Sequence, residues 1–288
     1  MLFTCELANL PSLHRAASTI KAMSISPPIA PPLPPQFDAP LITLQDFENK
    51  DLSTNACLWA SQFPELQWTC NIHKISLDRP PIKCTYRKFQ PQKQIGPTCG
   101  LVALSILLGN KVTAEELLTQ ARGKGYSING EMFSAKYLLD LLKENLDRCE
   151  FGEGCKVWLH EGSIETVDVM QFLLEGGAML VPYDAWYNHS PCQANGNKAH
   201  WALVCGIVIP QGQMARVLAW HGKSQRLAIW ELADLSLSNS NLNEFSPNRE
   251  RDGKEYVLPD GGINGPLGIC GRCIMIEGFR NGAVKICS

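Results

Sequence analysis

The segment 94–108 reads QIGPTCGLVALSILL, and the expected architecture follows from it. Its second half is apolar and rich in good helix formers, which predicts a buried helix. Pro97 fits the first turn of such a helix, and Gly96 and Gly100 permit close backbone approach on either side of Cys99. We therefore expect Cys99 at or near a helix N-terminus, where free N–H groups and the helix dipole favour a thiolate.

This arrangement has a catalytic and a structural interpretation. In the first, Cys99 is a nucleophile, and the side-chain amide of Gln94 is one donor of an oxyanion hole. In the second, Cys99 packs as a small hydrophobe that opens a core helix. The catalytic interpretation requires a base elsewhere in the chain.

Composition narrows the class of protein. The chain has 288 residues, 45% of them hydrophobic and 19% charged, which is typical of a soluble globular enzyme with a sizeable core. A net charge of −2 without a dense Lys/Arg run argues against general nucleic-acid binding. No apolar run approaches the roughly 18 residues of a membrane span, so we expect no integral membrane segment.

The twelve cysteines are expected to be reduced thiols. The first residues make a poor signal peptide, and a large core needs no disulfides, so we expect a cytoplasmic protein. Cys270 and Cys273 form a lone CxxC without a second ligand pair, which favours neighbouring strand positions over zinc. We expect neither a metal nor another cofactor.

Residues 1–40 differ from the rest of the chain. We expect a disordered N-terminal segment there, in preference to a transit peptide, and a single globular domain over 41–288. Six prolines lie between Ser26 and Pro35, which predicts a polyproline II rod. That rod is either a stiff spacer or a ligand for an aromatic groove of the SH3, WW or profilin kind.

The remaining pattern predicts an α+β fold, with helices in the first half and antiparallel strands in the second. After the helix that Cys99 opens, capping signals predict further helices from Thr113, from Ser134 and over 167–174. Apolar runs predict strands over 178–183, 200–209, 215–220, 227–230 and 274–276.

His200 is the best candidate for the base because it opens a predicted strand, as in other Cys/His enzymes. A hairpin turn at Gln211-Gly212 would place His200 opposite Lys223, within two residues, where neither a carboxylate nor an asparagine occurs. Asp184 ends the preceding strand close to His200. We expect Asp184 to orient the imidazole, bind substrate or cap a turn.

Together these residues resemble the actin maturation protease family. The resemblance rests on QIGPTCG at 94–100, LVPYD at 180–184, NHSPC at 188–192 and GNKAHWA at 196–202, with the proline-rich start and GKS at 222–224 in support. It implies a papain-like cysteine peptidase fold in which Cys99 is the nucleophile, His200 the base and Gln94 the oxyanion donor. Leader-peptide peptidases, which share the cysteine motif, place an Asp or Asn on the strand after the histidine, and this chain has none.

Members of that family remove the acetylated N-terminal Met or Cys from immature actin. The resemblance therefore implies the actin N-terminus as substrate, and we expect profilin as a partner of the proline-rich segment. Because acidic residues follow the cleaved bond in actin, Arg87, Lys88 and Lys93 are candidate substrate-binding groups, unless they form a solvated face. Other readings are deubiquitination, deamidation or acyl transfer by the same dyad, or a non-catalytic proline-rich interaction protein.

Overall fold

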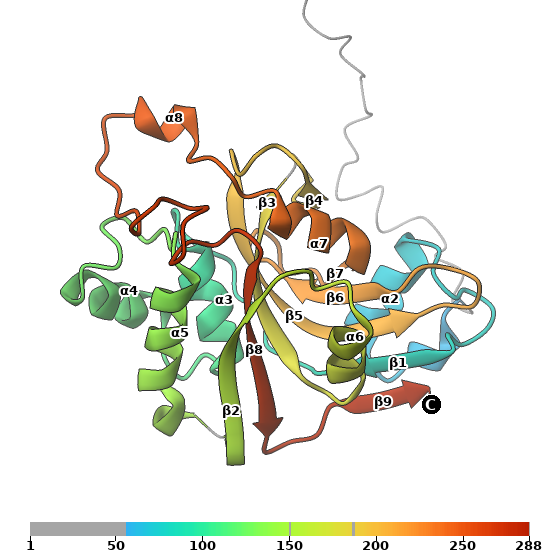
Figure 1. The fold of residues 1–288 in the computed structure, drawn as a ribbon. Helices are drawn as coiled ribbons and strands as arrows, with labels where there is room; N and C mark the ends of the chain where they lie inside the picture. The colour runs from blue at the N-terminus through green and yellow to red at the C-terminus, as the bar shows by residue number, and fades with distance from the viewer. Residues whose placement is uncertain (1–55, 150, 186–187, 288) are drawn as a thin grey trace, which may run out of the picture. The chain divides into compact units, whose positions relative to one another are not determined.

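An antiparallel sheet forms the centre of the structure, a computed structural model that describes residues 56–149, 151–185 and 188–287. The strands are β1 (Lys83–Tyr86), β2 (Phe151–Glu161), β3 (Ala178–Ala185), β4 (Pro191–Cys192), β5 (Ala199–Ile209), β6 (Arg216–Trp220), β7 (Ala228–Glu231), β8 (Arg272–Phe279) and β9 (Val284–Cys287). They follow the order β2-β8-β3-β5-β1-β9, with β4 beside β3 and with β6 and β7 continuing from β5 (Figure 1). The first and last strands of the described chain, β1 and β9, are therefore neighbours.

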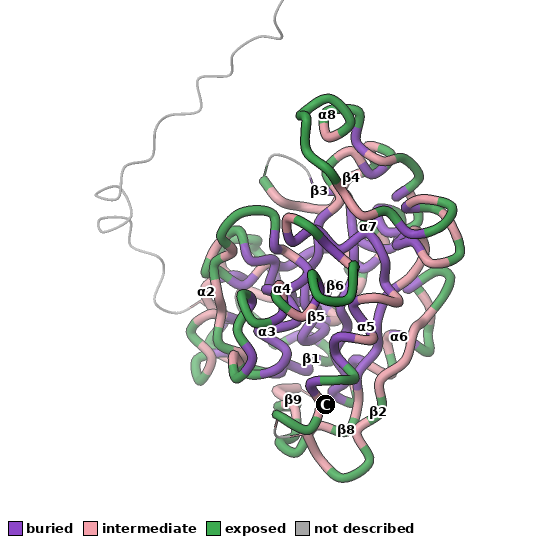
Figure 2. The backbone as a smooth tube through the Cα atoms, turned by 90° about the vertical axis from the view of Figure 1, so that its left-hand side faces the viewer, coloured by how far each residue is buried: buried purple, intermediate pink, exposed green. Residues whose placement is uncertain are grey.

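Helices cover both faces of the sheet. The longer ones are α2 (Pro64–Ile72), α3 (Cys99–Leu107), α4 (Ala114–Gly123), α5 (Ala135–Glu144), α6 (Val167–Leu174) and α7 (Leu232–Ser240); the short ones are η1 (Leu58–Ala60), η2 (Leu146–Arg148) and α8 (Pro247–Glu250). Helices α3, α4 and α5 pack on one face, and α6 and α7 on the other. This sandwich explains why β3 is buried along its whole length (Figure 2).

Side-chain alternation assigns each residue of a strand to one face. On β5, Trp201 and Leu203 belong to the core beneath α3, whereas Ala202 and Val204 belong to the core beneath α6 and α7. His200 therefore lies on the same face of β5 as Ala202. Its partner on β3 is Tyr183, whose ring meets the His200 ring edge-on at 5.6 Å.

The capping signals produce the expected helix starts. Thr113 and Glu116 form a reciprocal capping box at α4, and Ser134 accepts a backbone N–H bond at α5. Helix α6 ends before Gly176, whose φ of +96° suits glycine. Within the described ranges, no helix is long and apolar enough to span a membrane.

The α+β class and the expected strands are confirmed, but the division into two halves is only partly right. Strand β1 precedes the helix that begins at Cys99, β2 lies between α5 and α6, and α7 follows β7. The proline-rich segment and the expected boundary after residue 40 fall outside the described residues.

Candidate active site

Helix α3 begins at Cys99, as its sequence predicts. The residue before it, Thr98, uses its hydroxyl to donate to the Ile95 carbonyl, and its side chain makes no capping bond to the helix. The first N–H groups of α3 have no partner within the helix, so they remain available to a sulfur or an oxyanion. The half-buried thiol of Cys99 lies at this end of the helix.

The start of α3 packs directly against the start of β5. Backbone groups of Trp201 and Gly100 lie close enough to the Cys99 sulfur to lower the pKa of its thiol. Close approach depends on Gly100, because a Cβ there would lie 3.1 Å from Trp201 Cδ1 and 3.2 Å from Met132. The Trp201 indole is fixed in turn by its bond to the Met132 carbonyl at 2.8 Å. The fold thus brings the cysteine to the residue that follows His200.

The imidazole of His200 is oriented by a backbone carbonyl. Its Nε2 lies 2.6 Å from the His221 carbonyl oxygen, and both residues are buried. Because a carbonyl can only accept, Nε2 must carry the hydrogen, and Nδ1 of the neutral ring is then the free acceptor. The β5–β6 register, with Leu203 opposite Trp220, agrees with the hairpin expected from the sequence. Residues 221–225 include neither a carboxylate nor an asparagine, and the group that lies there is a main-chain carbonyl, which residue types do not reveal.

Asp184 does not take that position. It pairs with Ala199 on β5, so its side chain points to the opposite face of the sheet from Tyr183 and His200. Its fully buried carboxylate accepts three backbone N–H bonds of 2.8–2.9 Å from Ala194, Gly196 and Lys198. Of the three roles expected for Asp184, these bonds match the capping of a turn. The turn is the one that leads into His200.

Gln94 lies beside the same region. Its backbone N–H donates to the Gly222 carbonyl at 2.8 Å, and its Nε2 donates to the Gly96 carbonyl at 2.7 Å. An amide nitrogen carries two hydrogens, so one remains available to an oxyanion. The Oε1 atom is buried without a hydrogen-bond partner among the described residues.

Electrostatics favour neutral forms of the proposed dyad. Burial raises the pKa of the Cys99 thiol, although the two backbone groups and the cations Arg249 and Lys223 act in the opposite direction. Burial also lowers the pKa of His200 to about 4. The expected resting thiolate is therefore not supported, because desolvation outweighs the helix terminus. The directions of these two pKa shifts favour a thiol and a neutral imidazole over an ion pair.

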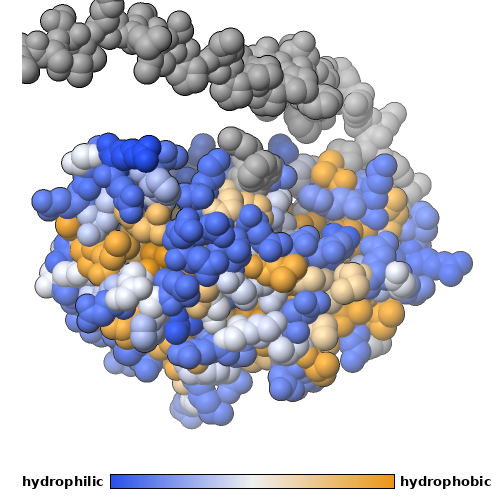
Figure 3. Space-filling model, turned by 45° about the horizontal axis from the view of Figure 1, so that its top comes forward, coloured by the Kyte–Doolittle hydropathy of each residue, from blue (hydrophilic) through white to orange (hydrophobic). Residues whose placement is uncertain are grey.

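A cationic cavity of about 330 Å³ lies beside His200. Among the residues that the structure describes, its lining includes His189, Lys198, Lys223 and Arg249, and no carboxylate. Arg249 belongs to α8, which lies at the upper left of Figure 1, and hydrophilic side chains gather over that part of the molecule in Figure 3. The Nη1 atom of Arg249 is buried and has no hydrogen-bond partner in the part of the chain that the structure describes.

A second cavity, about 240 Å³, begins at Thr98, the residue before Cys99. Ile95, Val102 and Leu118 give it apolar walls, and its charged lining residues are Lys93 and Glu115. Of the three cations expected near the cleft, Lys93 is thus the one close to the α3 start.

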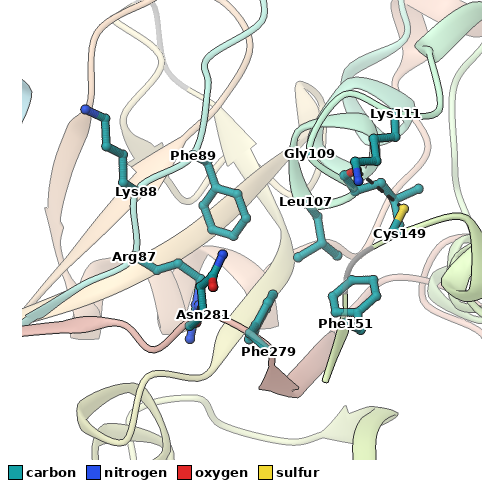
Figure 4. A pocket seen from close by; sticks show the side chains of 11 residues that line it. Arg87, Lys88, Phe89, Leu107, Gly109, Lys111, Cys149, Phe151, Phe279 and Asn281 are labelled. Atoms are coloured by element: carbon teal, nitrogen blue, oxygen red, sulfur yellow. Dashed lines mark hydrogen bonds between the residues drawn. The ribbon is translucent and has the colours of Figure 1, made fainter. Parts of the chain in front are cut away.

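Arg87 is a structural residue. Its guanidinium donates to the Gly176 and Asn281 carbonyls and lies 3.9 Å from the centre of the Phe279 ring. With Lys88 it lines a cavity of about 190 Å³ at the C-terminal end of α3, the opposite end from Cys99 (Figure 4). The expectation that Arg87 and Lys88 flank the catalytic cleft is therefore wrong for both residues.

The CxxC pair is divided between a loop and a strand. Cys273 is buried on β8, whereas Cys270 precedes that strand and donates its S–H to the Ser240 carbonyl. The expectation of neighbouring strand positions thus holds for Cys273 alone. Across the described ranges, no group of three or more His, Cys, Asp or Glu side chains is arranged to hold a metal ion.

Sequence comparisons identify relatives of this chain. Residues 89–208, which include both Cys99 and His200, match the family description "Actin maturation protease-like, C-terminal domain". The actin maturation protease of Drosophila melanogaster is 42% identical over 82% of this chain and 86% of its own length. Those of Xenopus tropicalis and Danio rerio are 31% and 34% identical over 67% and 64% of this chain, and over 73% and 71% of their own lengths. The chain belongs to the actin maturation protease family.

Proposed function

We propose that this chain is a cysteine-type aminopeptidase of papain-like fold that removes the acetylated N-terminal Met or Cys from immature actin. One observation carries the proposal: Cys99 opens α3 against the backbone of Trp201, next to a histidine whose tautomer leaves Nδ1 free. The names of its relatives supply the substrate, since they are actin maturation proteases. Reduced cysteines, eleven of them in the described residues, fit a cytoplasmic setting.

In the first half of the reaction, Nδ1 of His200 takes the proton from Sγ as Cys99 attacks the carbonyl of the acetylated residue. The second hydrogen of the Gln94 amide and the Cys99 N–H stabilise the oxyanion. When the tetrahedral intermediate collapses, the C–N bond breaks and the imidazolium returns its proton to the departing amine. The products are a thioester and the new N-terminus.

In the second half, His200 removes a proton from water, and the hydroxide attacks the thioester. Collapse of this intermediate breaks the C–S bond, and the proton returns to Sγ. The acetylated amino acid leaves as a carboxylic acid, which releases its proton to solvent, and the resting thiol and imidazole are restored. No group other than water enters the balance.

The two cavities support a division of the substrate. We assign the apolar cavity at Thr98 to the acetylated residue, which carries no amine charge. We assign the cationic cavity to the acidic residues after the cleaved bond. The buried, unpartnered Nη1 of Arg249 supports this assignment, because a carboxylate would satisfy a donor that is otherwise costly to bury.

We also propose that residues 27–35 dock on the aromatic groove of profilin. Such an arm would raise the effective concentration of the protease near profilin-bound actin without changing the chemical step.

Mass spectrometry of acetylated N-terminal actin peptides incubated with the purified chain tests the reaction. Loss of one acetylated residue is expected from the wild type, and no product from Cys99→Ala or His200→Ala. Cys192→Ala is the matched control, because Cys192 is another half-buried thiol and should keep full activity. An active Cys99→Ala variant, or cleavage of ubiquitin conjugates in place of actin peptides, would refute the proposal.

A further inference from the structure

The turn after β6 contacts two separate parts of the candidate active site through consecutive carbonyl groups. The His221 carbonyl accepts the Nε2–H of His200 at 2.6 Å. The Gly222 carbonyl accepts the backbone N–H of Gln94 at 2.8 Å. One dipeptide therefore holds both the residue proposed as base and the residue proposed as oxyanion donor.

This geometry depends on a left-handed residue at position 222. Gly222 has φ +71°, a conformation that L side chains adopt only with strain. A Cβ at this position would also lie 3.3 Å from Val102 Cγ1 and 3.6 Å from Gln94 Oε1. The turn is closed by the Lys223 N–H, which lies 3.3 Å from His221 Nδ1.

We propose that His221-Gly222 is the positioning element of the site, and that Gly222 sets the tautomer of His200 and the place of Gln94 together. The inference rests on the proposed function. It gives a positioning role to His221 and Gly222, which take no part in the chemical steps. A backbone carbonyl supplies a dipole where a side-chain acid would supply a charge. It fixes which imidazole nitrogen is protonated without adding an ion to a buried site.

The element also couples the two residues. Any displacement of the turn moves the acceptor of His200 and the acceptor of Gln94 at once, because the carbonyls belong to adjacent residues. If two separate side chains accepted these hydrogen bonds, the contact to His200 or to Gln94 could be lost while the other is kept.

The test compares Gly222→Ala with Gly212→Ala. Gly212 has a similar φ of +66°, but a Cβ there would have no atom within 4 Å. The control therefore strains the backbone in the same way and leaves the candidate active site undisturbed. Nitrogen-15 spectra of histidine-labelled full-length protein report the His200 tautomer, with His200→Ala identifying its signals among the six histidines. The rate at which iodoacetamide alkylates Cys99 reports the base.

We expect wild type and Gly212→Ala to show the Nε2–H tautomer of His200 at pH 7 and equal alkylation rates. Gly222→Ala should show mixed tautomers and alkylation at least tenfold slower. A folded Gly222→Ala protein with the wild-type tautomer and rate would overturn the proposal. Both measurements remain decisive if the wild type fails to cleave actin peptides, so the two proposals can fail separately.

A second variant applies if Gly222→Ala does not fold. Gly222→Asn in a Val102→Ala background keeps a residue that tolerates the left-handed region and removes the 3.3 Å contact. With Val102→Ala alone as reference, we expect the wild-type tautomer and at least half the alkylation rate. Mixed tautomers in the folded double variant would also overturn the proposal.

Discussion

Replacing Asp184 by Asn should destabilise the turn before His200 and leave the chemical step largely intact in the folded protein. The carboxylate accepts N–H bonds from Ala194 and Gly196 on one oxygen and from Lys198 on the other. Asn can keep the two bonds on one oxygen, but its NH₂ group must then face the third N–H donor. Losing one charge-assisted bond and the charge on the others costs about 2–4 kcal/mol.

For a domain of this size, that cost lowers the melting temperature by roughly 5–15 °C. Thermal unfolding followed by circular dichroism measures the loss. Asp140→Asn is the control, because Asp140 pairs with Lys136 on the surface of α5 and its loss should cost less than about 1 kcal/mol. Peptide cleavage assayed well below the transition should fall by no more than about tenfold.

If Asp184 instead oriented the imidazole of His200, Asp184→Asn should give a different result. Removing the acid that holds a catalytic histidine typically lowers kcat by about 10⁴ with the fold intact. A wild-type melting curve for Asp184→Asn, combined with a kcat loss of that size, would refute the assignment of Asp184 to the turn.

Three further predictions concern charge and the N-terminal segment. Burial lowers the pKa of His200 to about 4 and that of His221 to about 3, below the ordinary 6.5, so the unfolded chain binds more protons and stability should fall as the pH drops from 6.5 towards 4. The free energy of unfolding should change by up to about 1.4 kcal/mol per pH unit for each histidine. Urea unfolding at several pH values should show a smaller pH dependence in His200→Ala. An equal pH dependence in the wild type and this variant would contradict a buried, neutral His200. Arg249→Gln should raise KM for acidic actin peptides at least tenfold and should change KM little for peptides with Asn or Gln in place of the acids. Arg251→Gln is the control, because Arg251 is exposed. An equal rise in KM for both peptide types would show that Arg249 does not recognise the acids. Deleting residues 1–36 should spare cleavage of free peptides and slow cleavage of profilin-bound actin, and equal rates on profilin–actin would reduce the segment to a spacer.

Local signals predicted the parts of the site that depend on local structure. Helix α3 begins at Cys99 because Gly-Pro and an apolar run mark the start of a buried helix. The closeness of Asp184 to the start of β5 also followed from an antiparallel pairing of consecutive strands. The face of the sheet to which Asp184 points could not be predicted, because a shift of one residue in register moves a side chain to the other face.

Other features had no signal in the residue types. The acceptor for His200 is a main-chain oxygen, which every residue possesses, so no search for acids or amides can find it. Strand β2 carries glycines and charged residues and lies at a sheet edge. All its residues are partly or fully exposed, so the alternation of apolar and polar residues is weak. Arg87 resembled a surface cation, but its carbonyl partners lie near residues 176 and 281, far along the chain.

The adjacency of β1 and β9 has a consequence for biosynthesis. Tyr86 leaves the ribosome about 200 residues before its partner strand is complete, a delay of roughly 10–40 s at ordinary translation rates. Over most of that interval β5, which carries His200 and flanks β1 on its other side, is also missing. The nascent chain therefore carries the proposed nucleophile long before it possesses the proposed base, and we expect peptidase activity only after translation of the domain has finished.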